Sequence, residues 1–286
     1  MEEFDYSDRL PSSYQMIALG DFHVGNRSFD STIVSRAKRW LRRGKHRFFF
    51  GLGDLIEGIA PINDKRFSLD SVDGKFAQIG AQIDYVVELL EGVAHQGLFH
   101  LDGNHEWKHS TFQIVETISK RLDMDYGTAV SIANCGPFNL YAWHGGKSVN
   151  SSVTDIKRKM TNEALGVKRI LWGRHHGCEC MIMGHIHKAR ICAPDEDKFP
   201  RFIGNGKDHK FITPELKKTY VGTNRHDNYV HQDQRWYASN GAALRHYGDG
   251  FSNYAEKAGY FPEPARWITI EVKNDQLVGM DYLDCD

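Results

Sequence analysis

The sequence predicts a layered α/β fold, because short apolar runs alternate with longer segments that are apolar on one face only. Tyr14–Leu19 has the length and composition of a buried strand, and Phe29–Arg43 places its apolar residues at helical spacing. Further strands are expected at Phe48–Phe50 and at Gly97–Leu101, with a helix from Phe76 onward between them. The first half of the chain is therefore expected to form an open α/β sheet.

The second half of the chain is richer in predicted strands. A hairpin is expected from Ala129–Ala133 and Phe138–Trp143, followed by a helix over Val153–Trp172. The later strands are expected at Cys180–Met183, Trp236–Ala238, Trp267–Val272 and Leu277–Tyr282. Residues 188–234 lack clear periodicity, so we predict a single domain over residues 1–286 with an insertion or lid at about 188–234.

Composition indicates an ordinary globular protein that does not bind polyanions through its overall charge. Hydrophobic residues make up 41% of the chain, which is enough for a core, and the net charge is −1. Apolar runs are too short for a membrane span, and the start of the chain is acidic where a signal peptide would be basic. Five cysteines fit reduced thiols better than a disulfide framework. We therefore expect a cytoplasmic protein with no membrane partner.

Polar residues follow the predicted strands at the points where each strand ends. Open α/β sheets bind ligands just outside the carboxyl ends of their strands, and residues two apart on an extended segment point the same way. Each fragment alone is weak, since a Gly-Asp pair commonly marks a turn and His-x-His commonly lies on a polar surface strand. Together they predict one metal site, made from Asp21, His23, Asp54, Asn104, His105, His144, His185 and His187.

The donor set favours a borderline divalent metal. Carboxylate, amide and imidazole groups together suit Mn, Fe, Zn or Co. The set contains no thiolate, so it does not resemble a structural zinc site. A zinc site could also be drawn from His175, His176, Cys178 and Cys180, but their spacing is unusual for one and we do not favour it.

The order of these fragments resembles the calcineurin-like metallophosphoesterase superfamily. Its signature of Asp-x-His, Gly-Asp, Gly-Asn-His-Asp/Glu, His and Gly-His-x-His is matched here by Asp21-Phe22-His23, Gly53-Asp54, Gly103-Asn104-His105-Glu106, His144 and Gly184-His185-Ile186-His187. The resemblance implies two packed mixed β-sheets flanked by helices, with a dinuclear metal site at their edge. A binding or scaffolding protein on a degenerate version of the fold would lack ligands, and none is missing.

The resemblance also implies a role for each residue. Asp21, His23 and His187 would hold the first metal, Asp54 would bridge both, and Asn104, His144 and His185 would hold the second. We expect two Mn²⁺ ions, with Fe, Zn, Co or Ni as alternatives. A hydroxide bridging the metals would attack phosphorus, and His105 would stabilise the phosphate oxygens or protonate the leaving group.

Glu57 is the other predicted catalytic residue. In phosphatase relatives a carboxylate three residues after the bridging Asp orients the catalytic histidine, and Glu57 occupies that position after Asp54. Such a carboxylate would fix the tautomer of His105. The alternative is a solvated loop glutamate.

The substrate is less well defined by the sequence. Gly58 stands where the protein-phosphatase branch carries a phosphate-binding arginine, and Asp21-Phe22-His23-Val24-Gly25 resembles the start of the double-strand-break repair nucleases. The 99 residues after His187 leave little room for the additional DNA-binding domain of those nucleases. We expect a phosphodiesterase or nuclease that acts on nucleotide or nucleic-acid phosphodiesters, with DNA or RNA as partner. The alternative is a phosphomonoesterase, acting on protein or small-molecule phosphates at the same metal site.

Two local features remain open. The basic stretch Arg36–Arg47 is either a nucleic-acid contact or, as we prefer, the solvent face of a helix behind the sheet. Trp107 follows the Gly-Asn-His-Glu block and either lines the site or, as we prefer, packs against its neighbours.

Overall fold

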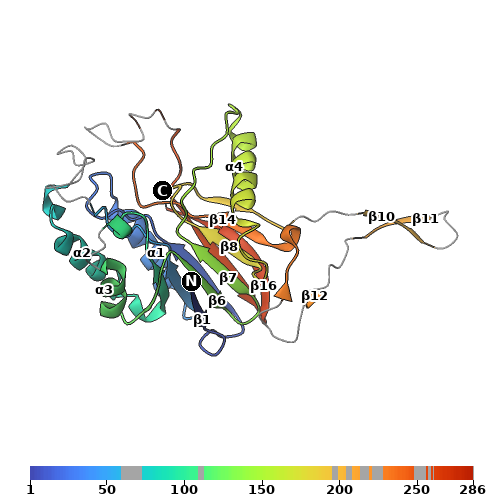
Figure 1. The fold of residues 1–286 in the computed structure, drawn as a ribbon, viewed down its shortest axis with the longest axis horizontal. Helices are drawn as coiled ribbons and strands as arrows, with labels where there is room; N and C mark the ends of the chain where they lie inside the picture. The colour runs from blue at the N-terminus through green and yellow to red at the C-terminus, as the bar shows by residue number, and fades with distance from the viewer. Residues whose placement is uncertain are drawn as a thin grey trace.

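A computed structural model of the chain describes residues 1–58, 73–108, 113–194, 199–203, 208–212, 219–220, 228–247, 256, 259 and 261–285. Two mixed six-stranded sheets form its centre, and helices cover their outer faces (Figure 1). The predicted fold class is therefore confirmed.

The first sheet has the strand order β16-β15-β2-β3-β4-β5. The four strands from β2 to β5 are parallel, and β15 and β16 join them as an antiparallel hairpin beside β2. The strands run β2 Tyr14–Leu19, β3 Arg47–Gly51, β4 Gly97–Leu101, β5 Asp125–Gly127, β15 Arg266–Lys273 and β16 Gln276–Asp284.

The second sheet has the strand order β1-β6-β7-β8-β14-β9. The predicted hairpin is confirmed as the antiparallel pair of β6 and β7, and β7, β8 and β14 are parallel to one another. The strands run β1 Glu2–Asp5, β6 Val130–Asn134, β7 Asn139–Trp143, β8 Cys180–Met183, β9 Arg190–Cys192 and β14 Trp236–Ser239.

Helices α1 to α3 lie on one flank of the molecule and α4 lies on the other (Figure 1). They run α1 Ser31–Arg42, α2 Ile79–Glu91, α3 Ile114–Arg121 and α4 Ile156–Leu171. Short 3₁₀ turns occur at Gly74–Phe76, Ala94–Gln96, Glu106–Lys108 and Gln232–Gln234. Asp30 and Asp155 cap the first turns of α1 and α4, since each side chain accepts a backbone N–H there.

Three layers of apolar packing hold the elements together. Between the sheets, Met16 and Phe50 of one sheet and Leu140 and Ile182 of the other are fully buried in one cluster. A second cluster joins α1, α2 and α3 to the outer face of the first sheet, and a third joins α4 to the second sheet. Burial on both faces explains why these strands are continuous apolar runs.

Within the predicted insertion, the first residues belong to the second sheet, because β9 pairs with β14. Two small hairpins follow, β10 Phe199–Ile203 with β11 Asp208–Ile212, and β12 Thr219–Tyr220 with β13 Asn228–Tyr229. Residues 195–198, 204–207, 213–218 and 221–227 lie outside the described residues, so the lid stays a prediction. In the described part of the chain, no helix combines the length and apolar character needed to cross a bilayer.

Candidate metal centre

The candidate ligands meet where the carboxyl ends of β2, β3, β4, β7 and β8 come together. The backbone N–H of Asp21 donates to the carbonyl of Gly53 at 2.8 Å, and that of Gly184 donates to Trp143 at 3.2 Å. Small residues allow this approach: a Cβ added at Gly184 would lie 2.7 Å from a carboxylate oxygen of Asp21. The loops of both sheets are thereby held at one edge.

Five of the predicted ligands have left-handed backbone conformations. Their φ angles lie between 48° and 72°, at Asp21, His23, Asp54, His185 and His187. Each such conformation costs on the order of 1–3 kcal/mol for a residue with a side chain, and this kind of strain concentrates at functional sites. The packed loops around the site therefore hold these five side chains in positions that the local backbone disfavours.

Three groups of side chains bring their ligand atoms within 4.8 Å of one another. One group is Asp21, His23 and His187, and another is Asp54, His144 and His185. The third, His23, Asp54 and His105, overlaps both of them. Asp54 lies between them, since its Oδ2 is 3.6 Å from Nε2 of His23 and 3.3 Å from Nε2 of His144. The structure thus brings together all seven residues predicted as ligands, with Asn104 Oδ1 3.0 Å from His144 Nε2 and 2.6 Å from His185 Nδ1.

The hydrogen bonding of His144 leaves three acceptor atoms facing one another with no hydrogen-bond donor between them. Its Nδ1 is 2.6 Å from the backbone carbonyl of Leu52, which can only accept, so the neutral ring carries its hydrogen there. Its Nε2 then presents a lone pair to the oxygens of Asp54 and Asn104. Three acceptor atoms facing one another require a cation between them or a protonated ring.

His23 repeats this arrangement on the other side of Asp54. Its Nδ1 lies 3.1 Å from the carboxylate of Glu57, so that neutral His23 also presents the lone pair of Nε2 to the site. That lone pair points at Nε2 of His187, 3.0 Å away, and Nε2 of His187 lies 3.4 Å from the carboxylate of Asp21. The donor chemistry at both ends of the cluster therefore fits a divalent ion.

The electrostatics also favour positive charge in the cluster. Burial acts to lower the pKa of His144, but the nearby carboxylate of Asp54 outweighs it and raises this pKa to about 9. Burial lowers the pKa of His105 to about 4, and the neighbouring His23 adds to that effect. Within the described residues, no lysine or arginine forms an ion pair with the cluster.

Glu57 contacts the predicted catalytic histidine through its backbone. The carbonyl oxygen of Glu57 lies 2.6 Å from Nδ1 of His105, whereas its carboxylate lies 3.9 Å from that nitrogen. The carboxylate instead contacts His23 and accepts from the side-chain amide of Asn26 at 3.2 Å. Glu57 is buried, so it is not a solvated loop residue, and it orients His23 by its side chain and His105 by its main chain.

Glu106 is a site residue that sequence reasoning missed. Its buried carboxylate accepts the backbone N–H groups of Asp54, Ile56 and Gly103 at 3.0, 3.1 and 2.9 Å. It therefore ties the loop after β3 to the loop after β4. The sequence pointed to Glu106 only through its position in the Gly-Asn-His-Glu block. Its contacts with residues about 50 positions earlier in the chain cannot be predicted from a local pattern.

Trp107 is 43% exposed, and its ring meets that of His144 edge-on at 6.0 Å between centroids. It therefore lies at the rim of the cluster, and packing accounts for only part of its surface.

The alternative zinc ligands are not brought together: in the described part of the chain, no group of three ligand atoms is formed by His175, His176, Cys178 and Cys180.

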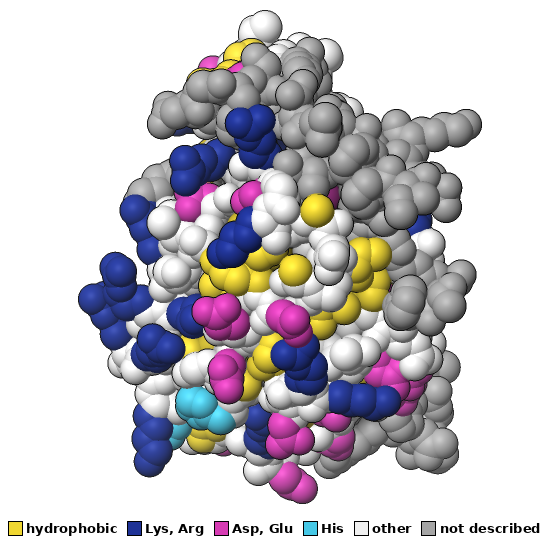
Figure 2. Space-filling view, turned by 90° about the vertical axis from the view of Figure 1, so that its left-hand side faces the viewer, with side chains coloured by type: hydrophobic (Ala, Val, Ile, Leu, Met, Phe, Trp, Pro, Cys, Tyr) yellow, Lys and Arg dark blue, Asp and Glu magenta, His cyan; other side chains and the backbone are white. Residues whose placement is uncertain are grey.

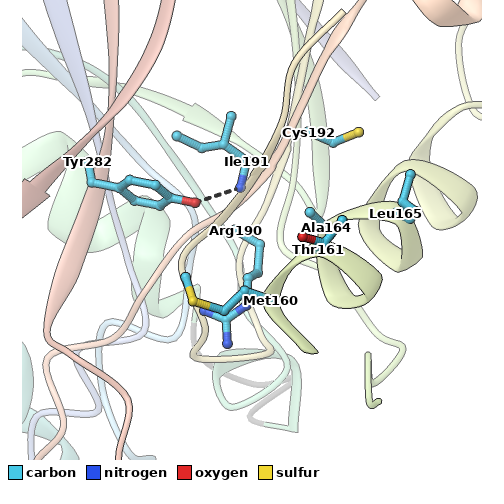
Figure 3. A pocket seen from close by; sticks show the side chains of 8 residues that line it. All are labelled: Met160, Thr161, Ala164, Leu165, Arg190, Ile191, Cys192 and Tyr282. Carbon is cyan, nitrogen blue, oxygen red and sulfur yellow. Dashed lines mark hydrogen bonds between the residues drawn. The ribbon is translucent and has the colours of Figure 1, made fainter. Parts of the chain in front are cut away.

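A cavity of about 280 Å³ lies apart from the ligand cluster, between α4 and β9 (Figure 3). Its charged lining residue, Arg190, bonds the carboxylates of Glu163 and Glu263 at 2.8 and 2.7 Å, and the hydroxyl of Tyr282 accepts from the backbone N–H of Ile191. Its polar groups are therefore used within the protein, and we assign the cavity no chemistry.

No family model and no curated protein sequence matches this chain. Among solved structures it is similar to the phosphoesterase YfcE from E. coli, at 12% identity and a TM-score of 0.40, over 95% of this chain and 100% of that one. It is also similar to the calcineurin-like phosphoesterase YfkN from Bacillus subtilis, at 9% identity and a TM-score of 0.41, over 96% and 91%. Such distant likeness carries no argument about chemistry, which depends on the site itself.

Proposed function

We propose that this chain is a calcineurin-like metallophosphoesterase that hydrolyses phosphodiesters of the nucleotide or nucleic-acid type. The observation that carries the proposal is the convergence of acceptor atoms around Asp54. His144 Nε2 faces oxygens of Asp54 and Asn104, and His23 Nε2 faces Asp54 from the other side. A pair of cations satisfies all of these lone pairs.

The cluster suits two ions, because Asp54 stands between two groups of ligands. Asp21, His23 and His187 would hold one, and Asn104, His144 and His185 the other. When bound, two divalent ions supply Lewis acidity and an activated water for attack on phosphorus. Nitrogen and oxygen donors without thiolate favour Mn²⁺, although Fe, Zn, Co and Ni fit the same donors.

The remaining residues of the site would orient its histidines and transfer protons. The carbonyl of Glu57 accepts from Nδ1 of His105, so the neutral ring carries a lone pair on Nε2. His105 would transfer a proton from Nε2 to the leaving oxygen only after the ring has taken up a second proton there, and it would return to the neutral form in that step. The backbone N–H of His105 donates to Oδ1 of Asp54 at 2.8 Å, so His105 is placed relative to the shared carboxylate. Glu57 holds the ring of His23 through its carboxylate.

A diester fits this site better than a monoester. A phosphomonoester carries more negative charge, and the protein-phosphatase branch binds it with an arginine at the position that Gly58 occupies in this chain. Gly58 has a φ of 63° and no side chain to replace that charge. All five cysteines are free, which suits the reducing cytoplasm where we place the protein.

The test is hydrolysis of bis-p-nitrophenyl phosphate and p-nitrophenyl phosphate by the purified protein with Mn, Fe, Zn, Co or Ni as the divalent metal, and after chelation. We expect metal-dependent cleavage with the diester preferred. Preference for the monoester would make the protein a phosphatase, and no activity on either ester with any of the five metals would contradict the proposal.

A further inference from the structure

Helix α4 and the loop before it form a strongly basic segment in a nearly neutral protein. Between Lys147 and Arg174 the sequence has seven lysines and arginines against two acidic residues, whereas the whole chain has a net charge of −1. Such a local concentration of charge is the footprint of a polyanion-binding surface.

Both acidic residues of the segment are already engaged. Asp155 caps α4 by accepting the backbone N–H of Arg158 at 2.8 Å. Glu163 is buried and bonds Lys188 at 2.9 Å and Arg190 at 2.8 Å. The exposed basic residues are thus not neutralised within the described part of the chain, where no ion pair involves Lys147, Lys157, Arg158 or Arg169.

The topology places the start of α4 at the edge that carries the candidate ligands. Strands β7 and β8 are parallel, and α4 connects them, so the helix runs back against their direction. Lys157 and Arg158 in its first turn therefore lie at the carboxyl edge, which holds His144 and His185. Arg169 is twelve residues further along the helix, about 18 Å away at 1.5 Å per residue.

The middle of α4 is fixed beside the metal centre by its own ion pair. Glu163 binds Lys188, which directly follows the candidate ligand His187. The helix is therefore a rigid element next to the cluster.

We propose that α4 is the binding surface for a nucleic-acid strand whose scissile phosphate lies at the metal centre. The inference rests on the proposed function and names its substrate as a polynucleotide. Lys147, Lys157 and Arg158 would contact phosphates near the cleaved bond, and Arg169 a phosphate several nucleotides away.

The other basic stretch, Arg36–Arg47, differs from α4 in its position in the fold and in the charges around it. Strands β2 and β3 are parallel and α1 connects them, so Arg39, Arg42 and Arg43 at the end of α1 lie at the edge away from the ligands. Figure 2 shows the flank of α1 to α3, where acidic and basic side chains are interspersed. This supports the solvent-face interpretation of that helix and provides a matched control.

The experiment compares two triple variants, Lys157→Gln/Arg158→Gln/Arg169→Gln on α4 and Arg39→Gln/Arg42→Gln/Arg43→Gln on α1. Binding of a fluorescent 20-nucleotide single-stranded DNA is followed by anisotropy in chelator, across a range of salt concentrations. For the α4 variant we expect weaker binding and a salt slope reduced by about 2, from roughly 0.7 per phosphate contact. The α1 variant should bind within about twofold of the wild type, well inside the effect of one lost phosphate contact.

Substrate length gives a second readout. With Mn²⁺, the rate of the α4 variant relative to wild type should fall more for the 20-nucleotide strand than for bis-p-nitrophenyl phosphate. Equal weakening in both variants, or wild-type binding to anionic phosphatidylserine vesicles and not to DNA, would overturn the inference. Failure to hydrolyse any phosphate ester would remove the proposed function, whereas the binding comparison in chelator would still stand.

Discussion

The carboxylate of Glu106 accepts the backbone N–H of Asp54 at 3.0 Å, and so fixes the residue that lies between the two groups of candidate ligands. The same carboxylate holds Ile56 and Gly103. Asp54 has a φ of 49°, a conformation that needs support from its surroundings. A side chain outside the groups of candidate ligands thus determines the position of Asp54.

Glu106→Ala is expected to destabilise the protein and to weaken metal binding. It would leave three buried N–H groups without an acceptor, at about 1–3 kcal/mol each. Glu106→Gln keeps one acceptor oxygen and should have a smaller effect. Thermal unfolding and Mn²⁺ titration calorimetry measure the two effects, and Glu116→Gln, which changes an exposed pair with Lys120, is the control. Wild-type stability and metal affinity in Glu106→Ala would contradict this role.

Loss of the shared ligand should differ from loss of a terminal one. Asp54→Ala is expected to abolish binding of both ions, because both groups of ligands include or adjoin that carboxylate. His187→Ala should lose one ion and retain the other, since His187 contacts only the group of Asp21 and His23. Native mass spectrometry with Mn²⁺ counts the ions. If Asp54→Ala retains one full equivalent, Asp54 does not bridge.

His105→Ala should keep both metals and lose turnover. The ring of His105 is held by the carbonyl of Glu57. A ligand atom of His105 also lies near those of His23 and Asp54, but each of these two belongs to a group of three that does not include His105. A general acid of this kind contributes about 10²–10⁴-fold to the rate. Metal content by mass spectrometry and kcat on bis-p-nitrophenyl phosphate separate the roles. Loss of an ion in this variant would make His105 a ligand.

Strands buried on both faces and the ligand motifs were predictable from the sequence. Tyr14–Leu19, Gly97–Leu101 and Cys180–Met183 were placed to the residue, because each is a short apolar run that ends in a polar turn. The elements missed include α3, the short edge strands β1, β5 and β9, and the strands β10 to β13, most of which have too few residues to show a period.

Contacts made by backbone atoms could not be predicted from the sequence. The position of Glu57 suggested a carboxylate that orients His105, whereas the structure uses the carbonyl of Glu57 for His105 and the carboxylate for His23. The hydrogen bonds accepted by the carboxylate of Glu106 join two loops that are far apart in the chain. Such contacts depend on how two loops meet, and residue type alone does not specify that.

The buried His100 should make the protein less stable in mild acid. Burial lowers its pKa to about 4, from the ordinary value of 6.5, so the ring is neutral in the folded protein. Its Nδ1 contacts the hydroxyl of Ser119 at 3.3 Å, and Gly51 packs so closely against the ring that a Cβ there would clash with it. Between these pKa values the unfolded chain binds a proton that the folded one does not, so stability falls as pH decreases from about 6.5 to 4.

The expected slope from this one group is up to about 1.4 kcal/mol per pH unit. Urea unfolding at pH 7, 6, 5 and 4.5 in chelator, which removes any contribution from bound metal, measures it. His100→Gln keeps a polar contact for Ser119 and should show a shallower loss of stability over this range. His46→Gln, at an exposed position, should keep the wild-type slope. Parallel curves for wild type and His100→Gln would mean that His100 is protonated without unfolding, and that its environment admits charge.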